Sequence, residues 1–234
     1  MAAPENQHDR LRALAEQGAS ALAGAEPHDV LRWADLHFGD SLAIASSMAA
    51  AVLGHLASTT APRAKIVFLD TGYHFAETLS TAAAVNTALP LEVLVVRPHR
   101  TVAGQDADHG PRLYERDPDL CCSLRKVQPL ARALNPFSAW ASGVRRDESA
   151  SRRNTETVHW DERRGMVKVN PLAYWTQARV EEYIAANDVI VNPLVHDGYP
   201  SIGCAPCTRR VAPGADPRSG RWADRDKSEC GLHV

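Results

Sequence analysis

Short apolar runs alternate with longer amphipathic ones between residues 41 and 96, and this alternation limits the possible folds more than any other feature of the chain. The runs SLAIAS, AKIVFLD and LEVLVV predict buried strands, whereas AAAVLGHLAS and HFAETLSTAAAVNTAL predict helices. Strands that alternate with helices favour a doubly wound α/β fold with a parallel sheet and right-handed crossovers. Such sheets bind ligands beyond the carboxyl ends of their strands, so the two candidate binding loops are residues 45–48 and 69–72.

The rest of the chain is less regular. Two helices are expected between about residues 8 and 37, and a helix SLRKVQPLARAL is expected to begin just after two adjacent cysteines. FSAWASGV predicts another strand, and TQARVEEYIAAN predicts a helix with Thr176 as its N-cap. The segment RTVAGQDADHGPRLYERDPDLCC is polar and turn-rich, and the final forty or so residues, rich in Gly, Pro and Arg, are expected to form an irregular tail. We expect one α/β domain over residues 1–234, of which about residues 208–234 form a flexible tail.

Composition narrows the class of partners. Hydrophobic residues make up 44% of the chain and the formal net charge is -2, so neither nucleic acid nor a membrane is an expected partner. The N-terminal segment has no basic start followed by an apolar run, so no signal peptide is expected. No apolar stretch reaches the roughly 18 residues that span a bilayer. These features predict a cytoplasmic protein, and in a reducing compartment a disulfide framework is the less favoured use of cysteine.

Five cysteines are spaced in a way that suggests one four-ligand site and one separate thiol. Cys121 and Cys122 are adjacent, Cys204 and Cys207 form a Cys-x-x-Cys pair, and Cys230 stands alone near the C-terminus. Four thiolates could hold a zinc ion, but two neighbouring cysteines reach one tetrahedral ion only through a strained ring. A [4Fe-4S] cluster gives each thiolate its own iron, so the cluster is favoured over zinc, and unliganded core cysteines are the third interpretation.

Cations lie near the adjacent cysteine pair and near Cys230. Arg125 and Lys126 follow the adjacent pair within one helical turn, where they would stabilise thiolate and cluster charge, although a solvated helix face explains them too. Cys230 has no partner cysteine, and a surface thiol is one interpretation of its position near the chain end. Lys227 and His233 lie close to it and two arginines precede it, so a thiolate held by cations is the alternative. We take Cys230 as the favoured nucleophile.

Two kinds of segment could bind an anionic ligand. In AIASSM, backbone N–H groups and the hydroxyls of Ser46 and Ser47 would face a phosphate if a helix begins there, whereas an ordinary N-cap is the simpler interpretation. The segment lacks the glycines of a Walker loop or a dinucleotide fingerprint, so ordinary ATP or NAD binding is not supported. Guanidinium groups suit phosphate and sulfate, although arginine-rich loops are often merely solvated. Six guanidinium groups are confined to two loops, and they belong to Arg145, Arg146, Arg152, Arg153, Arg218 and Arg221.

Longer motifs give the chain a resemblance to a known family. They are FLDTGYHFAET, CCSLRKVQPL, AWASGVRRDES, KVNPLAYWT, NPLVHDGYPSIGCAPCT, RSGRW and KSECGLH, and the resemblance extends from Ser41 to His233. On these motifs the chain resembles the sulfonucleotide (PAPS) reductases, specifically the iron-sulfur adenylylsulfate (APS) reductases of assimilatory sulfate reduction. The resemblance implies a mostly parallel sheet of the adenine nucleotide alpha hydrolase-like type, with an irregular, cluster-binding C-terminal part.

The resemblance also implies roles for individual residues. Cys230 would be the catalytic nucleophile, and Lys126 would lie between cluster and substrate. The [4Fe-4S] cluster would be held by Cys121, Cys122, Cys204 and Cys207. The substrate would contact Ser46, Ser47, Leu69, Gly143, Arg152, Arg218, Arg221 and His233. One departure is that Ala49 and Ala50 stand where many relatives carry an acidic or amide-acidic pair, so any ordering of the serine loop by those side chains must be absent or replaced.

The implied reaction is the reduction of adenylylsulfate to sulfite and AMP, as a part of cysteine biosynthesis. The Cys230 thiolate would attack the sulfur of APS and form an S-sulfocysteine, from which thioredoxin or a similar small dithiol protein would release sulfite. The cluster cysteines favour APS over its 3'-phosphorylated form, PAPS, because reductases of PAPS generally lack them. The physiological reductant and the oligomeric state, including a homo-oligomer, stay open.

Three other functions fit part of the sequence. A PAPS reductase could retain a cluster, since any spare arginine could meet the 3'-phosphate. A PP-loop sulfur transferase that thiolates tRNA would need an SGGxDS loop and a basic surface, and the chain has neither. A non-enzymatic iron-sulfur sensor would have no need of Cys230, so a role for this thiol separates the sensor from the reductase.

Overall fold

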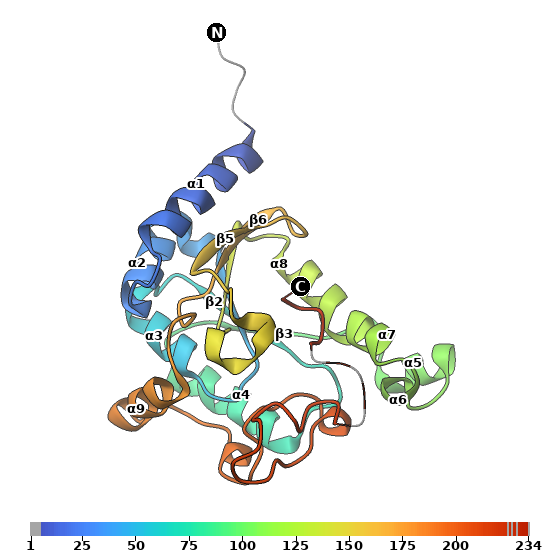
Figure 1. Cartoon of the computed structure of the whole chain (residues 1–234). Coiled ribbons are helices and arrows are strands. Elements are labelled where there is room, and N and C mark those ends of the chain that lie inside the picture. The colour runs from blue at the N-terminus through green and yellow to red at the C-terminus, as the bar shows by residue number, and fades with distance from the viewer. Residues whose placement is uncertain (1–5, 224, 226, 228, 234) are drawn as a thin grey trace.

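A six-stranded sheet forms the centre of the molecule (Figure 1). The computed structural model describes residues 6–223, 225, 227 and 229–233 of the 234-residue chain. The strands lie in the order β3-β2-β1-β4-β6-β5, and neighbours are parallel except for β5 and β6. Their bounds are β1 (Leu42–Ser46), β2 (Lys65–Leu69), β3 (Val93–Val96), β4 (Ala139–Ser142), β5 (Val158–Asp161) and β6 (Met166–Val169). The sheet confirms the predicted doubly wound, mostly parallel α/β fold.

Helices cover both faces of the sheet. Because alternate residues of a strand face opposite sides, neighbouring residues of one strand belong to different apolar clusters. Leu42 and Ile44 join a large apolar cluster with α1 (Gln7–Ala21), α2 (Pro27–Phe38), α3 (Val52–Thr60), α4 (Ala76–Ala88) and α9 (Gln177–Asn187). Ala43 joins a second cluster with α8 (Gln128–Leu134), beside which lie α5 (Val102–His109), α6 (Leu113–Arg116) and α7 (Pro118–Cys122) in Figure 1. No helix in the described part of the chain is long and apolar enough to cross a bilayer.

The polar, turn-rich segment before the cysteine pair forms the helices α5, α6 and α7, which the sequence analysis did not predict. Thr101 Oγ1 accepts a hydrogen bond from Gly104 N at 3.1 Å, and Asp117 Oδ1 accepts one from Leu120 N at 2.9 Å, so both residues cap helices. Pro118 occupies the start of α7, where no backbone N–H is needed. These capping contacts stabilise the short helices α5 and α7 although the composition is typical of turns. Thr176, in contrast, is the predicted N-cap of α9, and its hydroxyl accepts from Arg179 N at 3.2 Å.

The two adjacent cysteines lie at the end of α7 and not in front of a helix. A π-helical turn at Ser123–Val127 joins α7 to α8, so helical backbone continues from Pro118 to Leu134. The wider turn changes the direction in which the side chains after the cysteines point. The prediction that a helix begins just after the cysteine pair is therefore wrong in its start, because the cysteines belong to the helical stretch itself.

One edge of the sheet carries a β-hairpin that the sequence analysis did not predict. β5 and β6 pair antiparallel, with Val158 opposite Val169 and Asp161 opposite Met166. Gly165 lies in the connecting turn with φ +63°, a conformation that glycine adopts without a Cβ penalty. α1 packs on both strands of the hairpin, so the N-terminal helix covers this edge from one side.

The C-terminal tail covers a part of the second sheet face that α8 leaves open (Figure 1). α8 contacts β2 and β3, whereas Trp140 of β4 is fully buried beneath the end of the chain. Leu232 packs in the same apolar cluster as Trp140. The imidazole of His233 stacks on the Trp140 ring, with ring centroids 5.7 Å apart and ring planes 9° apart. The described end of the tail is therefore part of the second core.

Gly18 lies at a tight contact between α1, Trp33 of α2 and β5. A Cβ at this position would lie 2.7 Å from Trp33 Cζ2 and 3.1 Å from Val158 Cγ1. Gly18→Ala gains roughly 0.5–1 kcal/mol of helix propensity, but overpacking costs about 1–3 kcal/mol. We expect Gly18→Ala to lower the free energy of unfolding in urea by about 1 kcal/mol. Gln17→Ala, on the exposed side of the same helix, is the control and should change it by less than about 0.5 kcal/mol; equal effects would contradict tight packing at Gly18.

Candidate active site

The carboxyl end of β1 leads into a serine loop, residues 46–51. Ser46 Oγ accepts a hydrogen bond from the backbone N–H of Met48 at 3.3 Å, and Ser47 is exposed. α3 begins only at Val52, so the serines do not stand at the start of a helix and that prediction is wrong. The backbone instead turns at Met48, which has φ +58°, and this turn separates the serines from the helix.

The segment around Asn192 holds the serine loop in place. Asn192 is fully buried, and its Nδ2 donates to Met48 O at 3.2 Å while its backbone N–H donates to Ala49 O at 3.0 Å. Ala50 pairs with Val191 in an isolated antiparallel bridge. Backbone groups and one buried amide therefore order this loop, although Ala49 and Ala50 have no polar side chains.

Two further strand ends open onto the same edge of the sheet. Leu69 ends β2, and its carbonyl oxygen lies 2.7 Å from His74 Nε2. Gly143 directly follows β4 and is half-buried. Because β1 lies between β2 and β4 and all three are parallel, the structure brings Ser46, Leu69 and Gly143 to one edge of the sheet.

Four cysteines from distant parts of the chain line one small cavity. Cys121 and Cys122 come from the end of α7, and Cys204 and Cys207 from a loop in the C-terminal part. Thr71 Oγ1, just after β2, lies 3.3 Å from Cys204 Sγ. The other residues that line the cavity are Tyr73, Tyr114, Pro118, Arg125, Lys126, Pro206 and Trp222. The structure thus brings together the four cysteines that the sequence grouped by spacing.

The chemistry of these four thiols suits a soft metal group. Burial and the neighbouring thiols raise the pKa of Cys121 to about 12. Burial also raises the pKa of Cys122 to about 11, although Lys126 opposes the shift. The Cys121 and Cys122 thiols are therefore protonated near neutral pH unless a soft cation takes the place of the protons. Within the described residues, no three His, Cys, Asp or Glu side chains have the arrangement of a site for a single metal ion.

Lys126 lies near both the cysteine cavity and Cys230. It lines the cavity, and it is 8% exposed. Burial alone would lower the pKa of Lys126, but electrostatic interactions with the nearby Cys204 and Cys230 outweigh burial and raise it. A buried ammonium group in this position can stabilise negative charge on either side.

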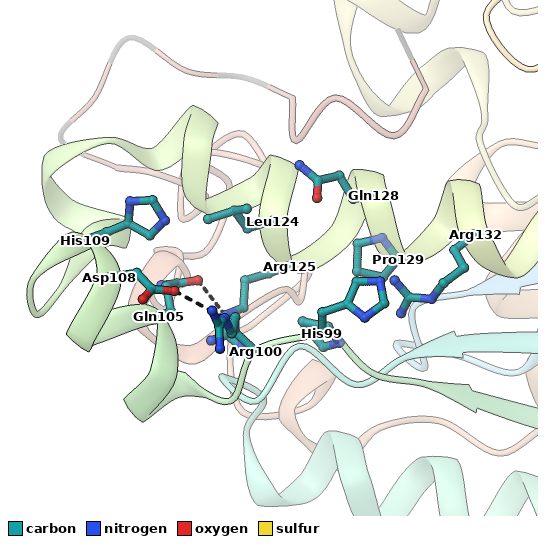
Figure 2. A pocket seen from close by; sticks show the side chains of 11 residues that line it. His99, Arg100, Gln105, Asp108, His109, Leu124, Arg125, Gln128, Pro129 and Arg132 are labelled. Carbon is teal, nitrogen blue, oxygen red and sulfur yellow. Dashed lines mark hydrogen bonds and ion pairs between the residues drawn. The ribbon is translucent and has the colours of Figure 1, made fainter.

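A larger pocket of about 210 Å³ lies beside Arg125, away from the substrate residues that the resemblance implies. Figure 2 shows it between α5 and the helical stretch that follows the cysteines. The buried Arg125 lines both this pocket and the cysteine cavity, and it donates to Gln105 Oε1 at 2.7 Å, Thr101 O at 2.8 Å and Thr71 O at 3.2 Å. Arg125 therefore separates the two cavities, and the candidate active site lies at the cavity that the cysteines line.

Three of the predicted arginines gather near the tail. Arg152 donates from Nε and Nη2 to the two carboxylate oxygens of Glu229, at 2.7 and 2.8 Å, and Arg218 Nη2 lies 3.4 Å from one of them. Burial alone would raise the pKa of Glu229, but Arg152, with Arg218, outweighs burial and lowers it. The guanidinium of Arg221 lies over the Trp222 ring at 4.5 Å, and burial lowers its pKa.

The other predicted arginines have structural contacts or lie at the surface. Arg145 Nε pairs with Asp147 Oδ1 at 3.1 Å. The guanidinium of Arg146 lies 3.9 Å from the centre of the Tyr174 ring. Arg153 is exposed. The arginine-rich loop therefore sends Arg152 toward the tail and uses its neighbours for packing or leaves them in solvent.

The tail holds Cys230 between two anchors. On one side Glu229 binds Arg152 and Arg218. On the other side Arg163 Nη1 and Arg164 Nη2, at the turn of the β5–β6 hairpin, donate to the next two carbonyl oxygens of the chain at 3.0 and 2.9 Å. Cys230 itself is half-buried. The nucleophile predicted from sequence is therefore held near the arginine group and Lys126.

Several residues of this arrangement escaped the sequence analysis. The cations Arg164 and Lys168 lie over the Trp140 ring at 4.9 and 4.7 Å, and burial lowers the pKa of Lys168 to about 8. These contacts cross between separate strands and the tail, so no periodicity or local spacing indicates them. Glu229 is different, because it directly precedes the favoured nucleophile in KSECGLH and an adjacent charge is a local signal.

Fold and site together define a doubly wound α/β protein that places thiols and cations beside the carboxyl edge of its sheet. Residues 41–210 match the phosphoadenosine phosphosulfate reductase domain, and the chain belongs to this family. It is 53% identical over 229 residues to the adenosine 5'-phosphosulfate reductase of Streptomyces coelicolor, with 98% of this chain and 97% of that protein covered. The protein of the same name from Mycobacterium tuberculosis strain H37Rv is 50% identical over 242 residues, with 96% and 95% covered.

Solved structures agree with the fold. The phosphoadenylyl-sulfate (PAPS) reductase of Candida auris, in a phosphate complex, superimposes with a TM-score of 0.73 at 28% identity, covering 90% of this chain and 100% of that one. The FMN adenylyltransferase of Candida glabrata, with FAD and pyrophosphate, superimposes with a TM-score of 0.56 at 11% identity, covering 100% and 78%. The second likeness concerns the fold alone. Together they confirm the predicted sheet of the adenine nucleotide alpha hydrolase-like type.

Protonation of His233 should release the tail. Its Nδ1 is buried with no hydrogen-bond partner among the described residues, and burial, together with the charges of Lys168, Arg152 and Arg164, lowers the pKa of His233 well below its ordinary value. The docked tail therefore binds fewer protons than the free tail. Docking is strongest above the ordinary histidine pKa of about 6.5 and weakens as the pH falls below it.

Hydrogen exchange of the C-terminal peptide, corrected for the intrinsic pH dependence, measures this release. We expect protection of residues 229–233 to fall between about pH 7 and pH 5. His233→Gln cannot take up the proton and should remove the pH dependence. His159→Gln is the control, because burial lowers the pKa of His159 to about 4 and it lies on the hairpin rather than in the tail. Protection that stays constant in the wild-type protein would contradict the release.

Proposed function

We propose that the chain is an adenylylsulfate (APS) reductase of sulfate assimilation, which reduces APS to sulfite and AMP. Relatives that are 53% and 50% identical over nearly their whole length carry that name. The observation that carries the proposal is the setting of Cys230, a half-buried thiol beside the charged Lys126 and next to the Arg152 and Arg218 group. Cations beside a thiol attract an anionic sulfur electrophile and stabilise the negative charge that the reaction places there.

In the proposed first step, the Cys230 thiolate attacks the sulfur of APS. A bond forms between the two sulfur atoms, and the bond from that sulfur to the phosphate oxygen breaks. AMP leaves with the electron pair, and Cys230 becomes an S-sulfocysteine. Lys126, Arg152, Arg218 and Arg221 reduce the repulsion between a thiolate and a polyanion and stabilise the charge on the departing phosphate. Ser46, Ser47, Leu69, Gly143 and His233 complete the proposed substrate contacts.

In the proposed second step, a small dithiol protein of the thioredoxin type attacks the Cys230 sulfur. The sulfur–sulfur bond to the sulfonate breaks, and sulfite leaves with its electron pair. The second thiol of the reductant then resolves the mixed disulfide and regenerates the Cys230 thiol. The two thiols of the reductant supply both electrons, so the chain itself needs no net redox change.

We also propose that Cys121, Cys122, Cys204 and Cys207 hold a [4Fe-4S] cluster. The residues fit this group in number and in chemistry, because four soft thiols line one cavity that buried Arg125 and Lys126 border. A bound cluster would supply fixed negative charge and a structural link between α7 and the C-terminal part. Arg125 and Lys126 would balance that charge, and Lys126 would direct positive potential toward the substrate.

PAPS reduction is the second candidate, since the Candida auris relative of known structure carries that name. Retention of all four cluster cysteines favours APS. Comparing kcat/KM on the two nucleotides decides between them, and a clear preference for PAPS would reject our assignment. A cytoplasmic place in cysteine biosynthesis and a homo-oligomeric state remain predictions.

Replacing the nucleophile tests the reaction. Cys230→Ser should lower thiol-dependent sulfite release from APS by about a thousandfold or more, since no thiolate remains to attack sulfur. The variant should still bind APS and keep its visible absorption, because Cys230 does not line the cysteine cavity. Sulfite release at the wild-type rate would reject the mechanism, whereas a wild-type protein that releases no sulfite from APS in the presence of thiol would favour a non-enzymatic sensor.

Replacing a ligand tests the cofactor. We expect anaerobically purified wild-type protein to carry about four irons and four sulfides per chain with a broad visible band, and Cys204→Ser to lose most of both. Thr208→Ser, a conservative change at a buried neighbour in the same loop, is the control and should retain them. Stoichiometric zinc, or wild-type protein without bound sulfide, would contradict the cluster.

A further inference from the structure

The carboxylate of Glu229 occupies the arginines that the proposed function assigns to the substrate. Arg152 binds its two oxygens through Nε and Nη2 at 2.7 and 2.8 Å, and Arg218 lies 3.4 Å from one of them. The side chains of Arg152, Arg218 and Glu229 are 13%, 16% and 13% exposed, so solvent screens this group only partly. A carboxylate fits the planar fork of a guanidinium as a phosphate or sulfate does. Glu229 and a substrate oxyanion would therefore compete for the same donors.

Glu229 occupies the Nε–Nη2 edge of the Arg152 guanidinium, the edge that binds an oxyanion through two parallel hydrogen bonds. Its third nitrogen, Nη1, binds Glu148 Oε2 at 2.6 Å. Each nitrogen of the guanidinium thus has a carboxylate partner in the docked state. Glu148 belongs to the same loop as Arg152, whereas Glu229 belongs to the tail. A substrate anion that binds the Nε–Nη2 edge of Arg152 must displace Glu229 from it.

The second anchor lets the tail stay attached while Glu229 leaves. Arg163 and Arg164 hold the carbonyl oxygens of Gly231 and Leu232, and His233 stacks on Trp140. None of these contacts involves Arg152 or Arg218. Loss of the Glu229 contact therefore releases Glu229 itself without undocking the segment after Cys230.

We propose that Glu229 is a positioning residue that stands in for the phosphosulfate of the substrate on Arg152 and Arg218. The proposal rests on the proposed function, because it needs APS to bind at these arginines. Arrival of APS displaces the carboxylate and lets Cys230 turn about the second anchor toward the sulfur. Departure of AMP vacates the arginines, and Glu229 returns to them. The exchange is non-covalent and involves no electron transfer.

This exchange lowers the apparent affinity for APS. Only the fraction of molecules in which Glu229 has left Arg152 can bind the nucleotide fully, so the apparent Kd is the intrinsic Kd divided by that fraction. A group that merely braced the site would act in the opposite direction, because its loss would weaken binding. The sign of the change on neutralising Glu229 therefore separates competition from simple structural support.

The test measures APS binding by calorimetry in a Cys230→Ser background, which prevents turnover. Adding Glu229→Gln should tighten APS binding by about tenfold, as expected if about one molecule in ten is free of the contact. Glu229→Asp is the control that keeps the charge, and it should restore most of the weaker wild-type affinity. In a Cys230→Ser, Arg152→Gln background, Glu229→Gln should change the Kd by less than about twofold, because the shared partner is gone.

Alkylation of Cys230 in the otherwise wild-type holoprotein gives a second readout. Mass spectrometry of the C-terminal peptide should show faster modification by iodoacetamide in Glu229→Gln than in the wild-type protein when no nucleotide is present. Unchanged or weaker APS binding by Glu229→Gln, or tightening that persists without Arg152, would overturn the exchange while leaving the reductase assignment intact. No APS binding by the Cys230→Ser protein would instead reject the proposed function.

Discussion

A parallel sheet has to bury both of its faces, and in this protein the second face is completed by the end of the chain. α8 covers β2 and β3, and Leu232 and His233 cover Trp140 of β4. Cys230 lies two residues before Leu232, so burial of the sheet also determines where the thiol lies. The site therefore depends on the core: whatever seats the chain end on Trp140 also brings Cys230 to the cations.

The contacts that hold the tail against Trp140 involve polar and charged groups whose burial costs free energy. Burial lowers the pKa values of His233 and Lys168, and Lys168 and Arg164 face the Trp140 ring rather than sharing a hydrophobic pocket. Cation–π contacts contribute only about 0.5–2 kcal/mol each, and the desolvation of charged groups opposes docking. The desolvation of these groups thus offsets a part of what the tail contacts contribute. Such opposition suits a thiol that, in the proposed reaction, has to meet a nucleotide and then a second protein.

The sequence predicted most of the fold because each element carries its own local signal. Alternating apolar runs indicated β1, β2 and β3 with the helices between them, and one side-chain cap indicated the start of α9 at Thr176. Local composition misled where single contacts decide the structure, as in α5 and α7, where the caps at Thr101 and Asp117 outweigh a turn-rich sequence. It also misled at the serine loop, because the turn at Met48 depends on hydrogen bonds from Asn192, far along the chain. The spacing of the cysteines predicted that four of them form one group. The contacts of Glu229, Arg163 and Arg164 join segments that are distant in the sequence, so no local pattern predicts them.

The cations of the site fall into a permanent and an exchangeable set, and this difference follows from their partners. Arg125 is held by a side-chain amide and two carbonyl oxygens of the folded body, and Lys126 is buried against the cysteine cavity, so neither can change partner without disrupting the fold. Arg152 and Arg218 share a carboxylate that belongs to the tail. Because the chain has a net charge of only -2, no general field draws a polyanion to the protein. The local field must come from these few cations. In the proposed exchange, Arg152 and Arg218 become available to a ligand only when Glu229 leaves them, which would link substrate binding to movement of Cys230.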